Sequence, residues 1–239
     1  MKLNEDFTAR SRLEDLGRWH VSGFVRRVAG ALPQGSVLLD AGAGECAYKK
    51  EFSHCRYFAV DLAIGERNWY YANLDCLAYL DRLPFADASF DAVLSTQTLE
   101  HLEWPRESVQ EFYRVLKPGG RLFLTAPMAQ AEHQMPFDFF RYTSSGLRSI
   151  CGQAGFREMS VQPFGGIFTR LAYELSRILT FVPGTGLRSG AFRLRGLLLF
   201  PLRAAVWVVV RILQLLLLAF EPLDRLKNDP FGWSLTAEK

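Results

Sequence analysis

The sequence predicts an α/β fold, a doubly wound parallel sheet with helices on both faces. Short apolar runs alternate with longer helical patterns between residues 36 and 163, which is typical of such sheets. One of these runs leads through Asp40 into a turn that contains Gly42 and Gly44. The length of 239 residues, with 49% hydrophobic and 22% charged residues, suffices for one α/β domain with a sizeable core.

Strands are expected where the apolar runs are short and bounded by turn residues. These runs lie at residues 36–40, 56–60, 90–95, 121–126 and 156–163, with a weaker one near 72–74. Helical patterns lie at residues 6–32 (one helix or two), 45–53, 105–116 and 143–154. Pro105 suits a first helical turn, residues 117–120 (KPGG) break the helix before them, and Gly155 closes the next one.

We expect a single domain over residues 1–239, built from four segments. An N-terminal helical segment (1–34) precedes a cofactor-binding core (35–165). An apolar, arginine-rich helical insertion (166–226) follows the core, and a final strand ends the chain (229–239).

The insertion contains two strongly apolar helical candidates, residues 167–182 and 197–220, which a Gly/Arg-rich link at 183–196 separates. Residues 166–220 hold seven arginines, no lysine and one acid, Glu174. The whole chain carries a net charge of only +3, so its remainder is net negative. Bulk charge therefore gives no case for nucleic-acid binding, and the positive balance belongs to an apolar segment.

Residues 197–220 approach the ~20 apolar residues that span a bilayer. Arg203 and Arg211 argue against a simple span, because arginine at mid-membrane is costly. A single crossing would also leave the final strand on the wrong side of the membrane. Either both helices pack on the domain or on a second subunit, or they lie in the membrane face as a hairpin with arginines at the headgroups. We favour the membrane hairpin.

Cysteine usage indicates a reducing compartment. No C-x-x-C pair occurs among Cys46, Cys55, Cys76 and Cys151, which suggests reduced thiols and neither a disulfide framework nor a zinc site. The N-terminus is charged and has no apolar core, so we expect no signal peptide. These features predict a cytoplasmic protein without a metal site.

The glycine turn predicts a nucleotide-like cofactor. Residues 42–47 (GAGECA) fit G-x-G-x-x-G/A, and Asp61 lies 19 residues after Gly42, where an acid can bind ribose hydroxyls. NAD and S-adenosylmethionine both carry such a ribose, so this pattern leaves both cofactors open.

Three further features separate the two cofactors. Asp40 directly precedes the turn, Asp75 comes eight residues before the LPF of 83–85, and residues 114–120 (RVLKPGG) precede a strand. Together with VLLDAGAG, these blocks resemble class I S-adenosylmethionine-dependent methyltransferases of the ubiquinone/menaquinone-biosynthesis type, over about residues 35–127. The resemblance implies a Rossmann-like sheet of seven strands, whose last strand is antiparallel, and S-adenosyl-L-methionine as cofactor.

The resemblance also implies roles for residues at matching positions. The glycine loop faces the methionine part of the cofactor, the acid that ends the second strand holds the ribose, the acid after the third strand contacts the adenine, and residues after the fourth strand line the transfer site. These positions are Asp40, Gly42 and Gly44; Asp61 and Leu62; Asp75 and Cys76; and Gln97 with Glu100 and His101. Cys46 stands where the family often has a third glycine, and we interpret it as a small buried residue, not a nucleophile.

A dehydrogenase is the alternative for this turn. Tyr113 and Lys117 match the Y-x-x-x-K of short-chain dehydrogenases. That pair belongs in the middle of a helix, whereas Lys117 stands at a helix end before Pro118. We therefore interpret the pair as part of a surface helix face.

Residues 127–143 are the candidate acceptor loop, because loops at the C-terminal edge of a parallel sheet hold substrates. Their E-H-x-x-P-x-D-F-F-R-Y-T block resembles a methyltransferase subgroup associated with polysaccharide or glycolipid biosynthesis. We expect His133 to be the general base, because imidazole exchanges protons near neutral pH. Asp138 would orient it and Arg141 would hold an acidic group of the acceptor; alternatively, the three form a structural network that fixes the loop. His101 is the second candidate base, or a cap for its loop.

The sequence thus predicts an S-adenosylmethionine-dependent methyltransferase that O-methylates a glycan or lipid-linked sugar at the inner face of the membrane. A quinone-like ring is the alternative acceptor. A protein of another class, a membrane-recruited binding module without turnover, also remains open.

Overall fold

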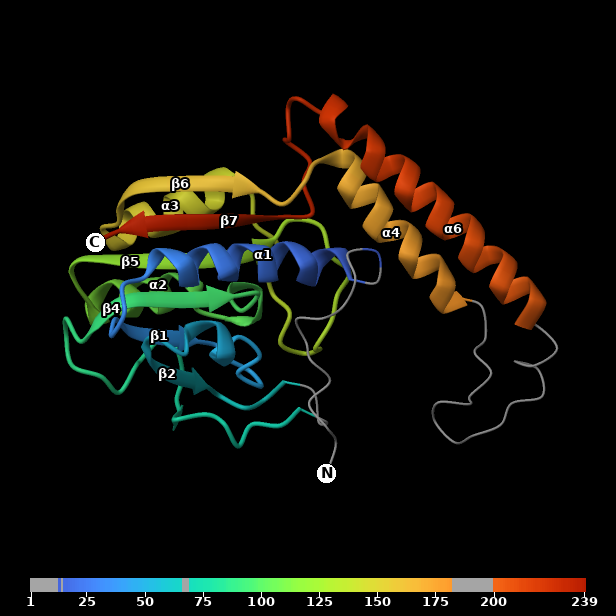
Figure 1. Ribbon diagram of the computed structural model, residues 1–239. Helices are drawn as coiled ribbons and strands as arrows, with labels where there is room; N and C mark the ends of the chain where they lie inside the picture. Colours follow the sequence, from blue (N-terminus) through green and yellow to red (C-terminus); the bar gives the residue numbers. More distant parts are fainter. Residues whose placement is uncertain (1–12, 14, 66–68, 182–199) are drawn as a thin grey trace.

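A seven-stranded sheet forms the centre of the molecule (Figure 1). The computed structural model describes residues 13, 15–65, 69–181 and 200–239. The strands follow the order β3-β2-β1-β4-β5-β7-β6 across the sheet. Their bounds are β1 Val37–Ala41, β2 Arg56–Asp61, β3 Cys76–Leu77, β4 Phe90–Thr96, β5 Leu116–Pro127, β6 Arg157–Pro163 and β7 Gly232–Glu238.

Five α-helices and three short 3-10 helices accompany the sheet in the described part of the chain. The α-helices are α1 Leu16–Ala31, α2 Pro105–Val115, α3 Ser144–Ala154, α4 Ile167–Phe181 and α6 Phe200–Phe220. The 3-10 helices are η1 Lys49–Phe52, η2 Leu99–His101 and η4 Glu221–Leu223. Pro105 begins α2, Thr143 caps α3 through the N–H of Gly146, and Gly155 ends α3 in the left-handed conformation, as the sequence predicts.

Helices cover both faces of the sheet, because neighbouring strand residues point to opposite sides. Leu38 belongs to the apolar core under α1, and Leu39 to the core under α2 and α3. Figure 1 shows α1 in front of the sheet and α2 and α3 behind it. This arrangement confirms the doubly wound α/β fold.

The strand order reverses between β1 and β4, which lie side by side in the sheet. Loops that leave these two strands therefore separate and open a crevice at their carboxyl ends. The glycine loop leaves β1 there, and residues 97–101 leave β4. The fold thus places both candidate segments at one edge of the sheet.

The last strand is antiparallel and inserts between β5 and β6, as the family resemblance predicts. Leu235 faces Leu124 of β5 on one side and Val161 of β6 on the other. Leu235 is fully buried, so this strand closes the core.

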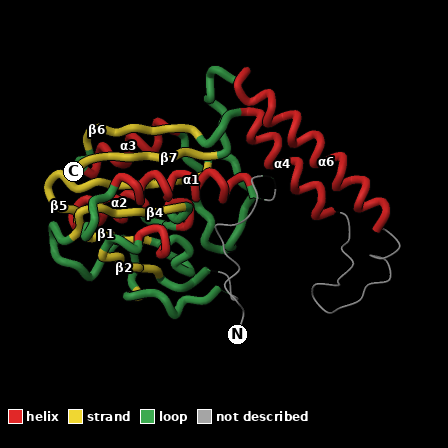
Figure 2. The backbone as a smooth tube through the Cα atoms, in the orientation of Figure 1, coloured by secondary structure: helices red, strands yellow, loops and turns green. Residues whose placement is uncertain are grey.

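An apolar insertion of two helices precedes β7, as predicted. Helices α4 and α6 lie side by side and project from the sheet (Figures 1 and 2). Inside the pair, the buried Gln214 amide donates a 2.8 Å hydrogen bond to the carbonyl of Ala172 and accepts one of 2.8 Å from Arg211. The predicted link at 183–196 lies outside the described residues, as do residues 1–12 of the N-terminal segment.

Three local predictions are wrong. The helix expected at 45–53 is only η1, because Gly44 and Cys46 have φ of 53° and 57°, which interrupt a right-handed helix. The strand expected at 72–74 lies at Cys76–Leu77, after a turn closed by Leu74 N–H on the Tyr71 carbonyl. The strand expected at 121–126 begins five residues earlier, at Leu116, so residues 117–120 follow the end of α2 as predicted but belong to β5, although Gly119 has a φ of 75°.

Candidate active site

The glycine loop is held in shape by close contacts that only glycine permits. Gly42 has a φ of 82°, and a Cβ there would lie 2.2 Å from the Thr98 side chain. The Gly42 N–H donates a 2.8 Å hydrogen bond to the Val60 carbonyl. Because the loop packs this tightly against the segment after β4, its backbone stands directly on the crevice.

Asp61 ends β2 and fastens the same loop. Its carboxylate accepts hydrogen bonds from the N–H groups of Gly44 (2.9 Å) and Ala63 (2.8 Å). Each carboxylate oxygen has two lone pairs, so each keeps one acceptor position for a ligand. Asp61 and the neighbouring Leu62 both line the crevice.

A cavity of about 1060 Å³ runs along this edge of the sheet. Seven of the predicted site residues line it: Gly42, Gly44, Asp61, Leu62, Gln97, His101 and His133. The volume suffices for a nucleoside cofactor together with part of an acceptor. The glycine loop and the two histidines therefore share one space.

Sequence reasoning missed the contribution of α4 and α6 to this cavity. Tyr173 and Ser176 of α4 and Gln214 of α6 line it. No local pattern predicts this contact, because it brings together residues that are far apart along the chain. The apolar helices thus reach the same cavity as the glycine loop.

Asp40 lies beneath the loop and is 2% exposed. The Tyr57 hydroxyl donates a short hydrogen bond to it. Burial raises the pKa of Asp40 to about 7, and the negative charge of Asp61 adds to the increase. The side chain is thus a buried support of the loop and stands back from the residues that line the cavity.

Cys46 is buried in the loop, and its thiol lies 3.5 Å from the Asn73 carbonyl. Burial raises the pKa of this thiol to about 12, which keeps it protonated near neutral pH. The environment agrees with a small buried residue and not with a nucleophile.

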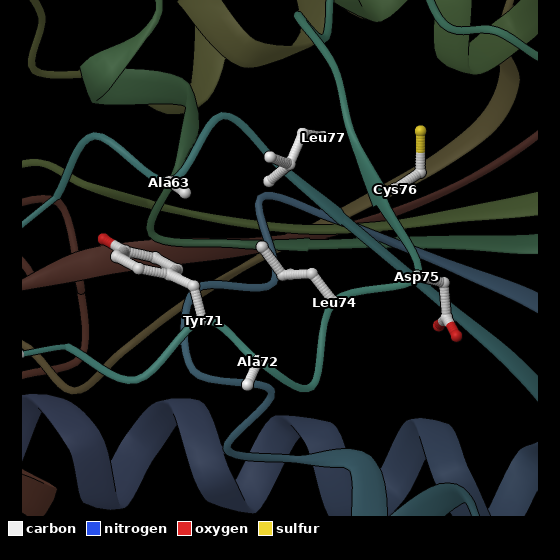
Figure 3. A pocket seen from close by; sticks show the side chains of 7 residues that line it. All are labelled: Ala63, Tyr71, Ala72, Leu74, Asp75, Cys76 and Leu77. Atoms are coloured by element: carbon white, nitrogen blue, oxygen red, sulfur yellow. The ribbon is translucent and has the colours of Figure 1, made fainter.

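Asp75 and Cys76 line a separate, smaller cavity of about 290 Å³ (Figure 3). Figure 3 shows the Asp75 carboxylate turned away from Tyr71 and Leu74. This carboxylate accepts a 2.8 Å hydrogen bond from the Ala59 N–H. Asp75 thus anchors β2, and the adenine contact implied by the family resemblance stays a prediction.

His101 and His133 meet in the lining of the large cavity. Their ring centroids are 4.7 Å apart, with the planes at 79°. His101 Nδ1 lies 2.5 Å from the Phe137 carbonyl, and His133 Nδ1 lies 3.1 Å from the Ala131 carbonyl. A carbonyl only accepts, so each Nδ1 carries the proton and each Nε2 keeps a free lone pair. Burial lowers the pKa of His101, which favours its neutral form.

Asp138 and Arg141 fasten the loop that carries His133. Arg141 donates to both Asp138 carboxylate oxygens, at 2.6 and 2.8 Å, and to the carbonyls of Gln130 and Ala131. This pairing lowers the pKa of Asp138 to about 2. Asp138 Oδ2 also accepts a 2.8 Å hydrogen bond from the His133 N–H and lies 3.4 Å from His133 Nδ1. Both residues therefore position the loop, as in the structural alternative above.

Glu100 stands beside the two histidines and is fully buried. Neither oxygen of its carboxylate has a hydrogen-bond partner among the described residues. Its Oε1 lies 4.0 Å from His101 Nε2, and burial raises the pKa of Glu100 to about 8. A buried carboxyl without partners is costly, so this group calls for a functional explanation.

Comparison with known proteins finds a family match for the part of the chain that carries the glycine loop. Residues 39–124 match the model of a methyltransferase domain family. The matched residues run from β1 through β5 and include the glycine loop, Asp61 and the segment after β4. The match supports S-adenosylmethionine as the cofactor, as the sequence predicts.

Two curated relatives are similar over about half of the chain. A malonyl-[acyl-carrier protein] O-methyltransferase of Hahella chejuensis is 30% identical over 145 residues, 54% of this chain and 50% of that protein. A 27-O-demethylrifamycin SV methyltransferase of Amycolatopsis mediterranei is 30% identical over 161 residues, 57% of this chain and 58% of that protein. The chain thus spans between half and three fifths of the length of these relatives.

The crystal structure of a SAM-dependent methyltransferase from Archaeoglobus fulgidus shares the fold. It superposes with a TM-score of 0.55 at 18% identity, covering 95% of this chain and 97% of that one. The seven-stranded sheet with its flanking helices is therefore the class I methyltransferase fold.

Proposed function

We propose that this chain transfers the methyl group of S-adenosylmethionine to an oxygen atom of an acceptor at a membrane surface. One observation carries the proposal: a single cavity joins the glycine loop to His101 and His133. A methyl donor and an acceptor must meet in line within one space that excludes bulk water.

The donor would lie on the glycine loop. Asp61 keeps acceptor positions for two ribose hydroxyls while it holds Gly44, and the glycines let the backbone approach the methionine part. Gln97, directly after β4, lines the cavity next to the loop. In this arrangement the sulfonium faces the histidine end of the cavity.

The acceptor hydroxyl would lie at the histidine pair. His133 Nε2 takes the hydroxyl proton while the oxygen forms a bond to the methyl carbon. The carbon–sulfur bond breaks at the same time, and its electron pair stays on the sulfur of S-adenosylhomocysteine. His101 packs against the His133 ring, and Asp138 and Arg141 hold the loop in position. One curated relative named above is a malonyl-[acyl-carrier protein] O-methyltransferase, and the other is a 27-O-demethylrifamycin SV methyltransferase; both names support an oxygen acceptor.

The hairpin of α4 and α6 supports a membrane location. Residues Pro201–Leu223 are long and apolar enough to cross a membrane: their most apolar 18-residue window has a mean hydropathy of 2.0, and 11% of that window is buried. Val208, Ile212 and Leu215 share one face of α6 and are 47%, 52% and 55% exposed. Burying the exposed half of such a side chain in lipid contributes about 1 kcal/mol.

We favour a hairpin that lies in the membrane face over a helix that crosses it. Strand β7 directly follows η4 and pairs with β5 in the sheet, so both ends of the hairpin join the same domain. Arg211 is engaged inside the protein, with Gln214 and with the Leu13 carbonyl. The apolar face of α6 is therefore the part that would enter the lipid, and Arg211 would stay inside the protein.

The acceptor would be a lipid-linked sugar or another glycan with a free hydroxyl. Helices α4 and α6 both touch the cavity and present apolar side chains outward, so a lipid-anchored group could enter from the membrane side. The block at residues 132–143, which resembles glycan-related methyltransferases, lies at this end of the cavity through His133, Phe137 and Phe139.

Transfer of labelled methyl groups tests the proposal. The protein is incubated with S-adenosylmethionine, labelled in its methyl group, and a membrane lipid extract, which is then separated by class. Label in a glycolipid fraction supports the sugar acceptor. If the label resists mild alkaline hydrolysis, the methyl group is bound as an ether and not as an ester. Label in the quinone fraction contradicts the sugar acceptor. Binding of S-adenosylmethionine with no transfer to any fraction would instead identify a binding module without turnover.

A further inference from the structure

Three potential metal ligands converge at the acceptor end of the cavity. One ligand atom from each of Glu100, His101 and His133 lies within 4.8 Å of the other two. Glu100 and His101 belong to η2 after β4, and His133 belongs to the loop after β5. The sequence predicts no metal site from its cysteines, and these three residues become neighbours only through the fold.

The hydrogen bonds of both imidazoles prepare them for coordination. His101 Nδ1 contacts the Phe137 carbonyl, and His133 Nδ1 contacts the Ala131 carbonyl and lies 3.4 Å from the Asp138 carboxylate. Histidines that bind metals donate their other ring N–H to a carbonyl or carboxylate in this way, which fixes the tautomer and the ring orientation. His101 Nε2 has no hydrogen-bond partner among the described residues, so its lone pair is available.

Glu100 would be the negatively charged ligand, and a bound cation would be the partner that its buried carboxylate lacks among the described residues. The side chain is fully buried, and both carboxylate oxygens lack hydrogen-bond partners within the described chain. Buried charges are normally paired or coordinate metals. Arg141, a nearby guanidinium, is already engaged by both oxygens of Asp138.

The donor set selects the class of metal. Two imidazole nitrogens and one carboxylate oxygen suit zinc and related divalent transition metals, whereas magnesium and calcium prefer oxygen ligands alone. Tetrahedral zinc, with bonds of about 2 Å, places its ligand atoms about 3.3 Å apart. The three ligand atoms, which lie within 4.8 Å of one another, need to approach by up to about 1.5 Å to reach this spacing. Three protein ligands leave one tetrahedral position for a further ligand, and two of the three, His101 and His133, line the cavity.

We infer that Glu100, His101 and His133 bind one divalent transition-metal cation, whose open position takes the acceptor oxygen. Binding of the cation stands on the geometry alone, whereas its role rests on the proposed methyl transfer. A bound cation lowers the pKa of a coordinated hydroxyl, which loses its proton to water before the cofactor closes the site to solvent. The oxygen then attacks the methyl carbon, and the electron pair of the broken carbon–sulfur bond remains on sulfur. With the cation bound, the two histidines are ligands, and loss of the proton to water replaces its transfer to His133 Nε2; the methyl transfer itself is unchanged.

Titration of tag-free, chelator-treated protein with Co²⁺ tests the inference, because cobalt in such a site absorbs visible light. We expect saturation at one equivalent and competition by Zn²⁺. Glu100→Gln keeps the size of the side chain and removes its charge, and His133→Gln changes a partly exposed side chain, so neither needs a rearrangement of the core. Each variant should weaken Co²⁺ binding by about tenfold or more. His54→Gln, outside the site, should leave binding unchanged.

The outcomes separate this inference from the proposed function. Affinity for S-adenosylmethionine and circular dichroism are measured on the same samples, and both should persist in all three variants. Absence of the visible band up to millimolar Co²⁺, or equal binding by wild type and Glu100→Gln, overturns the metal site. Methyl transfer that continues in the presence of a chelator would then leave the proposed function standing, with Glu100 as a buried protonated acid. If the wild-type protein binds Co²⁺ but does not bind S-adenosylmethionine, the proposed function is overturned and the metal site stands.

Discussion

The Asp61 carboxylate accepts a 2.9 Å hydrogen bond from the Gly44 N–H, which joins the end of β2 to the loop after β1. The two residues are 17 positions apart in the chain and lie on the same cavity. The bond shapes the loop while the carboxylate keeps free lone pairs toward the cavity. One residue thus serves both loop geometry and cofactor recognition.

Gly42→Ala should damage both the loop and cofactor binding. The new Cβ would stand 2.2 Å from Thr98, at a φ of 82° that L-residues rarely adopt. We expect a loss of about 1–3 kcal/mol in the free energy of unfolding, measured in urea, and a cofactor affinity weaker by about tenfold or more.

Gly30→Ala is the matched control for this change. Gly30 lies in α1, and a Cβ there meets nothing within 4 Å. Alanine should stabilise the helix by about 0.5–1 kcal/mol and leave cofactor affinity unchanged. If Gly42→Ala and Gly30→Ala have the same free energy of unfolding and the same cofactor affinity, the close contact at Gly42 is refuted.

The stability of the protein should depend on pH through Asp40. An unfolded aspartate loses its proton near pH 4, whereas the buried carboxyl keeps it up to a pKa of about 7. Between these values the folded state binds more protons, so the free energy of unfolding falls as pH rises through this window.

Asp40→Asn removes this titration. The amide resembles the protonated carboxyl and still accepts from the Tyr57 hydroxyl. Relative to wild type, the variant should therefore gain stability from pH 4 to pH 7, by an amount of the order of a few kcal/mol. Urea midpoints for both proteins across this range measure the effect. A difference between them that stays constant with pH would contradict the buried, protonated carboxyl.

His133→Gln should reduce turnover and spare cofactor binding. His133 belongs to the loop after β5 and not to the glycine loop, and its backbone N–H, which donates to Asp138, is unaffected. We expect kcat to fall by about 10²–10⁴ and the S-adenosylmethionine Kd to stay within a few-fold. The same substitution at His54 should change neither quantity, and near-normal turnover of His133→Gln would exclude this residue from the chemistry.

The apolar face of α6 should bind lipid. Replacing Val208, Ile212 and Leu215 with serine removes three exposed side chains from one face and leaves the contact of Gln214 with Ala172 in place. Flotation with anionic liposomes should recover the wild-type protein, and the triple variant should stay at the bottom of the gradient. Tyr70→Ser, at an exposed aromatic outside the hairpin, is the control and should float like wild type. Flotation of the triple variant to the same extent as wild type would contradict the membrane face.

The sheet was predictable because strands that are buried on both faces consist of continuous apolar runs, which are visible in the sequence. Residues 56–60, 90–95 and 121–126 all lie within strands of the sheet. The helix expected at 45–53 does not form, and the periodicity of apolar residues cannot reveal why. Cys46 adopts a positive φ, which L-residues other than Asn and Asp rarely do, and the chain continues as a turn.

The site was predictable only where residues are close in sequence. The glycine loop and Asp61 follow from spacing, and the clustering of His133, Asp138 and Arg141 follows from one short block. Contacts across the fold carry no such signal. The isolation of the Glu100 carboxylate and the entry of Gln214 into the cavity both depend on how β4, β5, α4 and α6 pack.

Calorimetric titration with S-adenosylmethionine tests the central claim, a methyl-donor site on the glycine loop, most directly. We predict one site per chain, competition by S-adenosylhomocysteine, and a loss of about 1–3 kcal/mol in binding free energy for Asp61→Asn, because the amide NH2 donates where the carboxylate oxygen would accept from a ribose hydroxyl. Asp87→Asn, at an exposed acid paired with Arg114, should bind as tightly as wild type. Absence of binding by the wild-type protein, or equal affinity of wild type and Asp61→Asn, would contradict the account.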